Sequence, residues 1–328
     1  ACGACPIDLG ICNGSSGEMS VQLSQDLRSF LEAIIPDTMD MLLAAYSKPL
    51  PDSFRVNTLK IDPENCLKLL QEEGLTVRKI PFTVDGFYAE PEGLLTVSLW
   101  HMLGYVYAQG PVSILVTELL DVEPGHWVLD LCAAPGSKTT HIAAKLCGEG
   151  VIVANDVSRT RIKALSSNMQ RCGVVNGVLT LADGRRFGYR HREMFDRVMI
   201  DAPCTSLGIG SKDWSVLRNW TTHSSIRLSR LQTSLLFSGY MALKPGGVLI
   251  YSTCTFHPIE NEAVVNNLLE KFEEAEVLPI TLNGLEYDSG FDEWGGRIFS
   301  PEVRKTVRIW PFQSGAEGFY IAKIRKPG

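Results

Sequence analysis

The sequence predicts an α/β protein with a mainly parallel sheet that closes in an antiparallel hairpin, preceded by a smaller α/β module. From residue 127 onward, apolar runs typical of buried strands alternate with segments of helical periodicity. Such alternation is typical of a parallel sheet covered by helices on both faces. Two further runs near the end, 306–311 and 318–324, are close enough in sequence to pair as a hairpin.

The elements of the larger sheet can be placed from periodicity and turn residues. Five apolar runs are expected to be strands, at 127–131, 151–155, 178–182, 197–201 and 248–252. Apolar positions at helical spacing predict helices between them, at 139–146, 161–172 and 225–243. In an open α/β sheet of this kind, ligands bind at the carboxyl ends of the strands.

The first third of the chain carries a different pattern. Residues 1–20 contain glycine and serine with little periodicity and are expected to be a disordered lead-in. Helical spacing follows over 21–46 with a break at Pro36, and then a strand, a helix and two strands are expected, at 54–59, 63–73, 77–80 and 86–89. The predicted division is therefore a lead-in (1–20), N-terminal helices with a small α/β module (21–110), and a larger α/β domain (111–328).

Composition narrows the class of protein. The 328 residues are 45% hydrophobic and 21% charged, and no apolar run approaches the length of a membrane span. A soluble protein without a membrane partner is therefore expected. The nine cysteines are scattered rather than arranged as a small secreted disulfide framework, which favours a reducing cytoplasm. The chain is expected to act as a monomer.

Three of the cysteines lie in the lead-in. Cys2 and Cys5 have the spacing of half a zinc site, and Cys12 follows them. No second pair or nearby histidine completes a set of four ligands. A flexible tail is favoured over a metal site, and no metal is expected in this protein.

Two cysteines follow apolar runs that are expected to be buried strands. Cys204 ends the motif Asp-Ala-Pro-Cys, and Cys254 ends the motif Tyr-Ser-Thr-Cys fifty residues later. Either thiol alone is most simply a small buried side chain. As a pair at matching strand ends they indicate reactive thiols, because a thiolate is stabilised near the helix N-termini at that edge of a sheet.

A loop of small residues follows the strand expected at 127–131. It leads into a predicted helix and consists of Cys132, Ala133, Ala134, Pro135, Gly136, Ser137 and Lys138. Small side chains let the backbone approach a ligand closely, and the turn directs amide groups into the cleft. The spacing of its glycine and lysine fits neither a dinucleotide-binding fingerprint nor a phosphate-binding P-loop. On its own, the loop would not be distinguished from an ordinary strand-to-helix turn.

Carboxylates end four successive strands of the predicted sheet. Asp156 follows the strand at 151–155, where a carboxylate can accept hydrogen bonds from both hydroxyls of a ribose. Asp183, after the next strand, is suited to an adenine amino group. One such aspartate is often only a cap or turn residue. Four of them, counting Asp130 and Asp201, indicate a pocket that favours a positively charged ligand.

These motifs together resemble the NOL1/NOP2/Sun family of RNA cytosine-5 methyltransferases, the RsmB/RsmF-like enzymes that use S-adenosyl-L-methionine. The resemblance extends over residues 54–322 and follows the family's order of motifs: the loop at 130–138, Asp-Ala-Pro-Cys at 201–204, Lys-Pro-Gly-Gly at 244–247, Tyr-Ser-Thr-Cys at 251–254 and Glu-Asn-Glu at 260–262. Ser137 departs from the family's usual glycine. This small change should narrow the loop slightly without abolishing binding.

The resemblance implies a Rossmann-like methyltransferase sheet preceded by an RRM-like module that helps to hold RNA. It implies that Cys254 is the nucleophile that adds to carbon 6 of cytosine, and that Cys204 assists release of the product. Asp201 would contact the cytosine edge and Lys138 would organise the site. The residues implied to bind S-adenosyl-L-methionine are Cys132, Ala133, Ala134, Pro135, Gly136, Ser137, Lys138, Asp156, Arg161, Asp183 and Asp201. Arg161 could equally be a solvated helix residue.

RNA is the partner that the resemblance implies, although the net charge of −6 argues mildly against it. Local basic clusters soften that objection, at 185–186, 190–192, arginines 218, 227 and 230, and 304–308. Transfer RNA is favoured over ribosomal RNA because the chain is compact and has no long basic tail. The alternatives are a non-catalytic RNA-binding scaffold, which would not need every motif residue, and methylation of another kind of substrate, which would leave the second cysteine unexplained.

Overall fold

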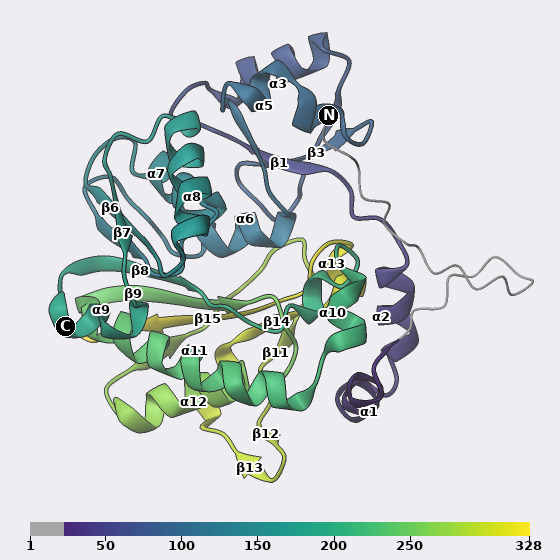
Figure 1. The fold of residues 1–328 in the computed structure, drawn as a ribbon, viewed down its shortest axis with the longest axis vertical. Helices are drawn as coiled ribbons and strands as arrows, with labels where there is room; N and C mark the ends of the chain where they lie inside the picture. Colours follow the sequence, from purple (N-terminus) through teal and green to yellow (C-terminus); the bar gives the residue numbers. More distant parts are fainter. Residues whose placement is uncertain (1–22) are drawn as a thin grey trace, which may run out of the picture.

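The computed structural model describes residues 23–328, so the lead-in with its three cysteines lies outside the described residues. Its larger sheet has nine strands in the order β11-β14-β15-β9-β8-β5-β6-β7, with β10 also paired to β15 (Figure 1). The bounds of these strands are β5 Trp127–Asp130, β6 Val151–Asp156, β7 Gly177–Leu181, β8 Phe195–Asp201, β9 Leu243–Thr253, β10 Glu276–Leu278, β11 Asp288–Ser289, β14 Val307–Ile309 and β15 Phe319–Arg325.

The pairing of these strands confirms the predicted parallel sheet and its closing hairpin. The pairs β7–β6, β6–β5, β5–β8 and β8–β9 are all parallel. β15 runs antiparallel to both β9 and β14, and the short helix α13 (Pro311–Ser314) connects β14 to β15. Most boundaries shift by one to three residues, and the largest shift is in β9, which begins at Leu243 rather than at Val248, so the Lys-Pro-Gly-Gly motif lies inside the strand.

Helices cover both faces of the larger sheet because its central strands are apolar on both sides. Leu129, Val198 and Leu249 pack in one core with α11 (Thr222–Ala242) and α12 (Glu262–Lys271). Their chain neighbours Val128, Met199 and Ile250 pack in a second core with α6 (Pro111–Glu118) and α7 (Ser137–Lys145). The alternation follows the two-residue period of a strand. In Figure 1, α11 and α12 lie together below the sheet.

The small module precedes this domain and has its own sheet. Its elements are β1 (Ser53–Val56), α3 (Pro63–Glu72), β2 (Thr76–Lys79), β3 (Gly86–Glu90), the one-turn helices α4 (Leu94–Val97) and α5 (Leu99–Met102), and β4 (Val106–Ala108). The strands are antiparallel in the order β2-β3-β1-β4. This is a β-α-β-β-α-β module with its first and third strands at the centre. The sequence did not predict β4, which is only three residues long.

The two N-terminal helices pack on the larger domain. α1 (Gln25–Ile34) and α2 (Met39–Tyr46) share a core with side chains from the loops that follow β8 and β9, including Leu207 and Phe256. The hydroxyl of Tyr46 donates to the main-chain oxygen of Leu207 at 2.6 Å. The helices therefore brace two loops that lie close to the candidate site.

No helix in the described part of the chain is both long and apolar enough to cross a membrane.

Candidate active site

The parallel pairing of β8 and β9 brings the two predicted cysteines together. Asp201 is in register with Ser252, so the two strands end side by side. Cys254 follows β9 directly, and Cys204 lies in the loop after β8. The two Sγ atoms are 3.4 Å apart. A single ligand at this edge of the sheet can therefore contact both sulfur atoms.

The two thiols differ in their tendency to ionise. The pKa of Cys254 is lowered, first because it is hydrogen-bonded to Cys204, with further contributions from Ser206 and Lys138. The same hydrogen bond, together with burial, raises the pKa of Cys204 well above its ordinary value. These opposite shifts favour Cys204 as the donor and Cys254 as the acceptor in the contact between the two sulfur atoms. Since the thiolate is the nucleophilic form of cysteine, the lower pKa favours Cys254 over Cys204 as a nucleophile.

A lysine–carboxylate pair lies at the same edge. Lys138 Nζ is 2.8 Å from Asp201 Oδ2 and also donates to Ser113 Oγ at 3.0 Å. Ser252 donates to the other oxygen of Asp201 at 2.8 Å. The sequence did not single out Ser113 or Ser252 as site residues. Ser252 lies within the Tyr-Ser-Thr-Cys motif, but Ser113 is 25 residues from Lys138 and no local pattern links them.

The small-residue loop connects β5 to α7 as predicted. Gly136 immediately precedes α7 with a φ of +109°, a left-handed conformation that favours glycine, and a Cβ there would lie 2.9 Å from a methyl of Leu165. Ser137 begins the helix, so the departure from the family's glycine occupies an ordinary helical position. The buried guanidinium of Arg55, from β1, donates to the Ser137 carbonyl at 3.3 Å and to Thr140 Oγ1. The module thus contacts the first turn of α7.

Asp156 and Arg161 both contact the loop. Asp156 is 3% exposed, and its Oδ2 accepts the Ala134 N–H at 3.3 Å while its Oδ1 accepts the Ser158 N–H at 2.8 Å. Arg161, on α8 (Arg159–Cys172), donates to the Ala134 carbonyl and lies 3.4 Å from Asp156 Oδ2. These contacts place the carboxylate in a fixed orientation beside the backbone of Ala134.

Other predicted residues are less closely joined to the site. Asp183 is partly exposed and forms a bidentate ion pair with Arg185, which lowers the pKa of its carboxyl. The side chain of Cys132 packs against the core, and burial raises its thiol pKa, which disfavours the reactive thiolate. Asp130 is buried, with one oxygen accepting from Thr139 at 2.6 Å, and burial raises its pKa to about 7.

The Glu-Asn-Glu motif lies buried beneath the cysteine loops. Asn261 contacts the residues on both sides of Cys254, accepting from Thr253 Oγ1 at 2.6 Å and donating to the Thr255 carbonyl at 3.0 Å. Glu262 forms a buried ion pair with Arg308, whose guanidinium also donates to the Phe256 carbonyl. The sequence placed Arg308 in a surface basic cluster. That assignment was wrong, because Arg308 is 2% exposed and its charge is neutralised internally.

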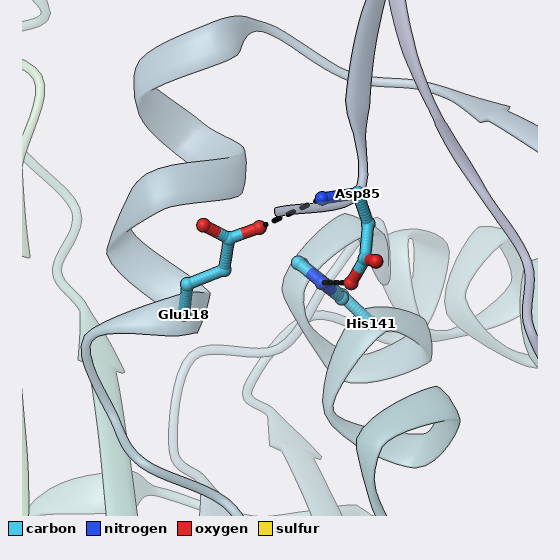
Figure 2. Close-up of side chains that lie close together, drawn as sticks. All are labelled: Asp85, Glu118 and His141. Carbon is cyan, nitrogen blue, oxygen red and sulfur yellow. Dashed lines mark hydrogen bonds and ion pairs between the residues drawn. The ribbon is translucent and has the colours of Figure 1, made fainter. Parts of the chain in front are cut away.

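Three further side chains with metal-binding chemistry converge away from this edge (Figure 2). Asp85, Glu118 and His141 each offer an atom within 4.8 Å of the others. Burial lowers the pKa of His141 to about 3, so the ring is neutral. Lys145 Nζ lies 3.3 Å from Asp85 Oδ2 and supplies a cation, while Glu118 accepts the N–H groups of Val84 and Asp85. The cluster therefore joins the module to α6 and α7.

Two family models match the chain in succession. The one described as 16S rRNA methyltransferase RsmB/F matches residues 117–325. The one described as the N-terminal domain of 16S rRNA methyltransferase RsmF matches residues 23–111. The chain belongs to the RsmB/RsmF family of S-adenosyl-L-methionine-dependent RNA cytosine-5 methyltransferases.

Curated members of the RsmB/RsmF family include enzymes named for different RNAs. A tRNA (cytosine(49)-C(5))-methyltransferase of Pyrococcus abyssi is 42% identical over 89% of this chain and 93% of its own length. The ribosomal RNA small subunit methyltransferase F of a Shewanella species is 38% identical over 93% of this chain, but over only 63% of its own length. This chain thus spans less than two thirds of the RsmF relatives.

Solved structures support the same RsmB/RsmF fold. A methyltransferase homologue from Pyrococcus horikoshii superposes with a TM-score of 0.80 at 34% identity, covering 90% of this chain and 92% of the other. NSun6 from Pyrococcus horikoshii, solved with SFG, has a TM-score of 0.79 at 24% identity, covering 93% and 98% of the two chains, and shows the fold alone.

Proposed function

We propose that this protein methylates carbon 5 of a cytosine in RNA, with Cys254 as the nucleophile. The 3.4 Å separation of the two sulfur atoms carries this proposal, since both face one small volume at the ends of β8 and β9. An enzyme with a single catalytic thiol would not need the second cysteine there. Covalent catalysis suits this reaction because it divides one difficult step into easier ones.

The reaction balances with the groups present. The Cys254 thiolate forms a bond to carbon 6, which raises the electron density at carbon 5. Carbon 5 would then take the methyl group that S-adenosyl-L-methionine supplies when bound, leaving the cofactor as the neutral thioether. A base, either Cys204 in its thiolate form or water, would then take the carbon 5 proton. The electron pair of that C–H bond forms the double bond between carbons 5 and 6, and the bond between carbon 6 and sulfur breaks to return its electron pair to the Cys254 thiolate. Cys204, 3.4 Å away, is positioned to assist this last step.

Asp201 and Lys138 act together in this proposal. Asp201 would contact the polar edge of the cytosine while Lys138 and Ser252 orient its two oxygens. Charge-assisted hydrogen bonds of this kind are stronger than neutral ones. The target base is unpaired or flipped out of its stack to enter the site.

The residues near the loop fit S-adenosyl-L-methionine, which supplies an electrophilic methyl group when bound. Asp156 would accept the ribose hydroxyls beside the backbone of Ala134, and Arg161 would fix the loop. The loop residues Cys132 to Lys138 would contact the cofactor mainly through backbone groups. Asp183 would accept a hydrogen bond from the adenine amino group after its ion pair with Arg185 breaks. A pocket with several carboxylates suits a cofactor with a positive sulfur.

We propose that α11 carries part of the RNA-binding surface. Gln232 on this helix donates to the Pro203 carbonyl at 2.8 Å, so α11 lies against the loop that holds Cys204. Arg227 and Arg230 are exposed on it and form no ion pair within residues 23–328. By contrast, Arg304 and Lys305 are paired with Asp292 and Glu302. Arg227 and Arg230 thus have no ion-pair partner in the described part of the chain and lie on a helix that contacts the Cys204 loop.

Transfer RNA is the proposed substrate, with the protein acting as a cytoplasmic monomer. The similarity to an archaeal transfer RNA enzyme over nearly its full length supports this choice. We also propose that residues 21–110 help to hold RNA and that 111–328 perform catalysis, which the two successive family matches support.

The proposal is tested by bisulfite sequencing of transfer and ribosomal RNA incubated with the purified protein and S-adenosyl-L-methionine. We expect new 5-methylcytosine in transfer RNA, and none with Cys254→Ala. Methylation confined to ribosomal RNA would refute the proposal that transfer RNA is the substrate. Cofactor binding without methylation of any RNA would favour a non-catalytic scaffold.

A further inference from the structure

Glu260 is fully buried and is surrounded by neutral donors. Its Oε2 accepts the Thr205 N–H at 3.0 Å and Gln232 Nε2 at 2.9 Å, and its Oε1 accepts Thr205 Oγ1 at 2.6 Å. Burial raises the pKa of this carboxyl. A buried carboxylate is costly to desolvate, and Glu260 gains no ion pair in return from residues 23–328. Its contribution must therefore lie in the groups that it arranges.

Those groups are the residues that directly follow the two cysteines. Thr205 follows Cys204, and Thr255 follows Cys254. Their hydroxyl oxygens are 2.7 Å apart. Because Thr205 Oγ1 donates its proton to Glu260, Thr255 donates to Thr205. One carboxylate thus connects both cysteine loops through two threonine hydroxyls.

Glu260 is itself fixed to the sheet and to a helix. The hydroxyl of Tyr251, within β9, donates to the Glu260 carbonyl at 2.6 Å. Gln232 of α11 bonds both to the Glu260 carboxylate and to the Pro203 carbonyl, one residue before Cys204. We call these contacts of Glu260 with Thr205, Gln232 and Tyr251 the clamp. The clamp fixes the chain just before and just after Cys204 relative to β9, the strand that Cys254 follows.

We propose that Glu260 is a positioning residue that sets the separation of the two sulfur atoms and so allows Cys204 to donate to Cys254. Glu260 touches neither sulfur and acts through Thr205 and Thr255. The inference rests on the proposed roles of the two cysteines. It concerns their geometry, which can be tested without RNA or cofactor.

The test is the pH dependence of Cys254 alkylation by iodoacetamide in the full chain, followed by mass spectrometry of the Cys254 peptide. In Glu260→Gln an amide replaces one acceptor oxygen and faces the Thr205 donors. We expect the pH at which Cys254 alkylation is half-maximal to rise by about one unit. At neutral pH, alkylation would then be about tenfold slower. Cys204→Ala should cause a rise of similar size.

A double-mutant cycle separates positioning from general support of the fold. If Glu260 acts through Cys204, adding Glu260→Gln to Cys204→Ala should cause little further change. An undiminished second shift would overturn the proposal, as would an unshifted midpoint in a folded Glu260→Gln protein.

The threonine offers a matched pair should Glu260→Gln not fold. Thr205→Ser keeps both bonds to the carboxylate and should alkylate as the wild type does, whereas Thr205→Val removes the hydroxyl and should shift the midpoint in the same direction as Glu260→Gln. Equal behaviour of the two variants would contradict the clamp. Alkylation requires no RNA, so a failure here is distinct from a failure of the proposed methylation.

Discussion

Asp156, the residue proposed to bind the ribose, is held in one orientation by main-chain contacts. Its two oxygens already accept N–H groups from Ala134 and Ser158, so little orientational freedom remains to be lost on binding. The sequence predicted this residue from its place after a strand. It could not predict the contact with Ala134, since the two residues are 22 positions apart in sequence, with helix α7 and most of strand β6 between them.

Replacing Asp156 with alanine should weaken S-adenosyl-L-methionine binding by about 1–3 kcal/mol, because charge-assisted hydrogen bonds to the ribose are lost. Isothermal titration calorimetry measures the effect. Asp196→Ala is a matched control, since it removes a carboxylate near the opposite end of the sheet, where Asp196 pairs with Lys244. Equal affinities in all three proteins would show that another residue binds the ribose.

The cysteine motifs were the most predictable part of the site. Each was recognised from a short string after an apolar run, and the structure places both at one sheet edge. Their unequal pKa values could not be predicted, because they depend on a 3.4 Å contact between residues fifty positions apart. Ser113 and Glu260 were missed as site residues for the same reason.

At the scale of elements, the loop between β2 and β3 is joined to α7 by a buried polar cluster. His141 has a pKa of about 3 in the folded chain, against an ordinary value of 6.5, because burial disfavours its charged form and Arg55 and Lys145 oppose a further positive charge, although Asp85 favours it. Between these values the unfolded chain binds a proton that the folded chain does not. Stability from this group is therefore present above pH 6.5 and is lost as the pH falls toward 3.

His141→Gln should flatten the dependence of unfolding free energy on pH. Between pH 6 and 4, the slope of unfolding free energy against pH should decrease by about 1.4 kcal/mol per pH unit, because unfolding of the variant no longer takes up the proton of His141. Urea titrations at several pH values measure it. Two other buried groups also contribute to the pH dependence. The pKa of His257 is similarly low, and the raised pKa of Asp130 acts with the opposite sign. Both residues are present in variant and wild type, so their contributions cancel in the comparison. Parallel curves for variant and wild type would contradict a neutral buried His141.

The order of helices and strands was largely predictable, whereas their tertiary partners were not. The two apolar faces of the central strands specified a covered parallel sheet, and the structure confirms it. The helical pattern at 21–46 predicted α1 and α2 but not their packing beside Leu207 and Phe256. An apolar stripe indicates that one face of a helix is buried, but not which residues cover it. β4 was too short to stand out from its surroundings.

At the scale of the whole molecule, an acidic protein is proposed to bind a polyanion through a local basic surface. RNA affinity should fall with rising salt as counterions are released from phosphates. Replacing Arg227 and Arg230 with glutamine should weaken binding and reduce the slope of log affinity against log salt by about 1–2. Filter binding over a range of salt concentrations measures both quantities.

Arg304→Gln is the control for that measurement, because Arg304 is exposed but paired with Asp292. Its affinity and slope should stay near the wild-type values. An affinity independent of salt, or a larger effect from Arg304 than from the arginines of α11, would place the RNA elsewhere.

The division of labour between the two cysteines is tested most directly by a denaturing gel. Wild type, Cys204→Ala and Cys254→Ala are each incubated with substrate RNA and S-adenosyl-L-methionine. If Cys254 attacks and Cys204 assists release, Cys204→Ala should form the covalent bond, transfer the methyl group and stall, giving a protein–RNA adduct that survives denaturation. Cys254→Ala should give none. An adduct from Cys254→Ala and none from Cys204→Ala would reverse the assigned roles, and full activity of both variants without an adduct would contradict covalent catalysis in this protein.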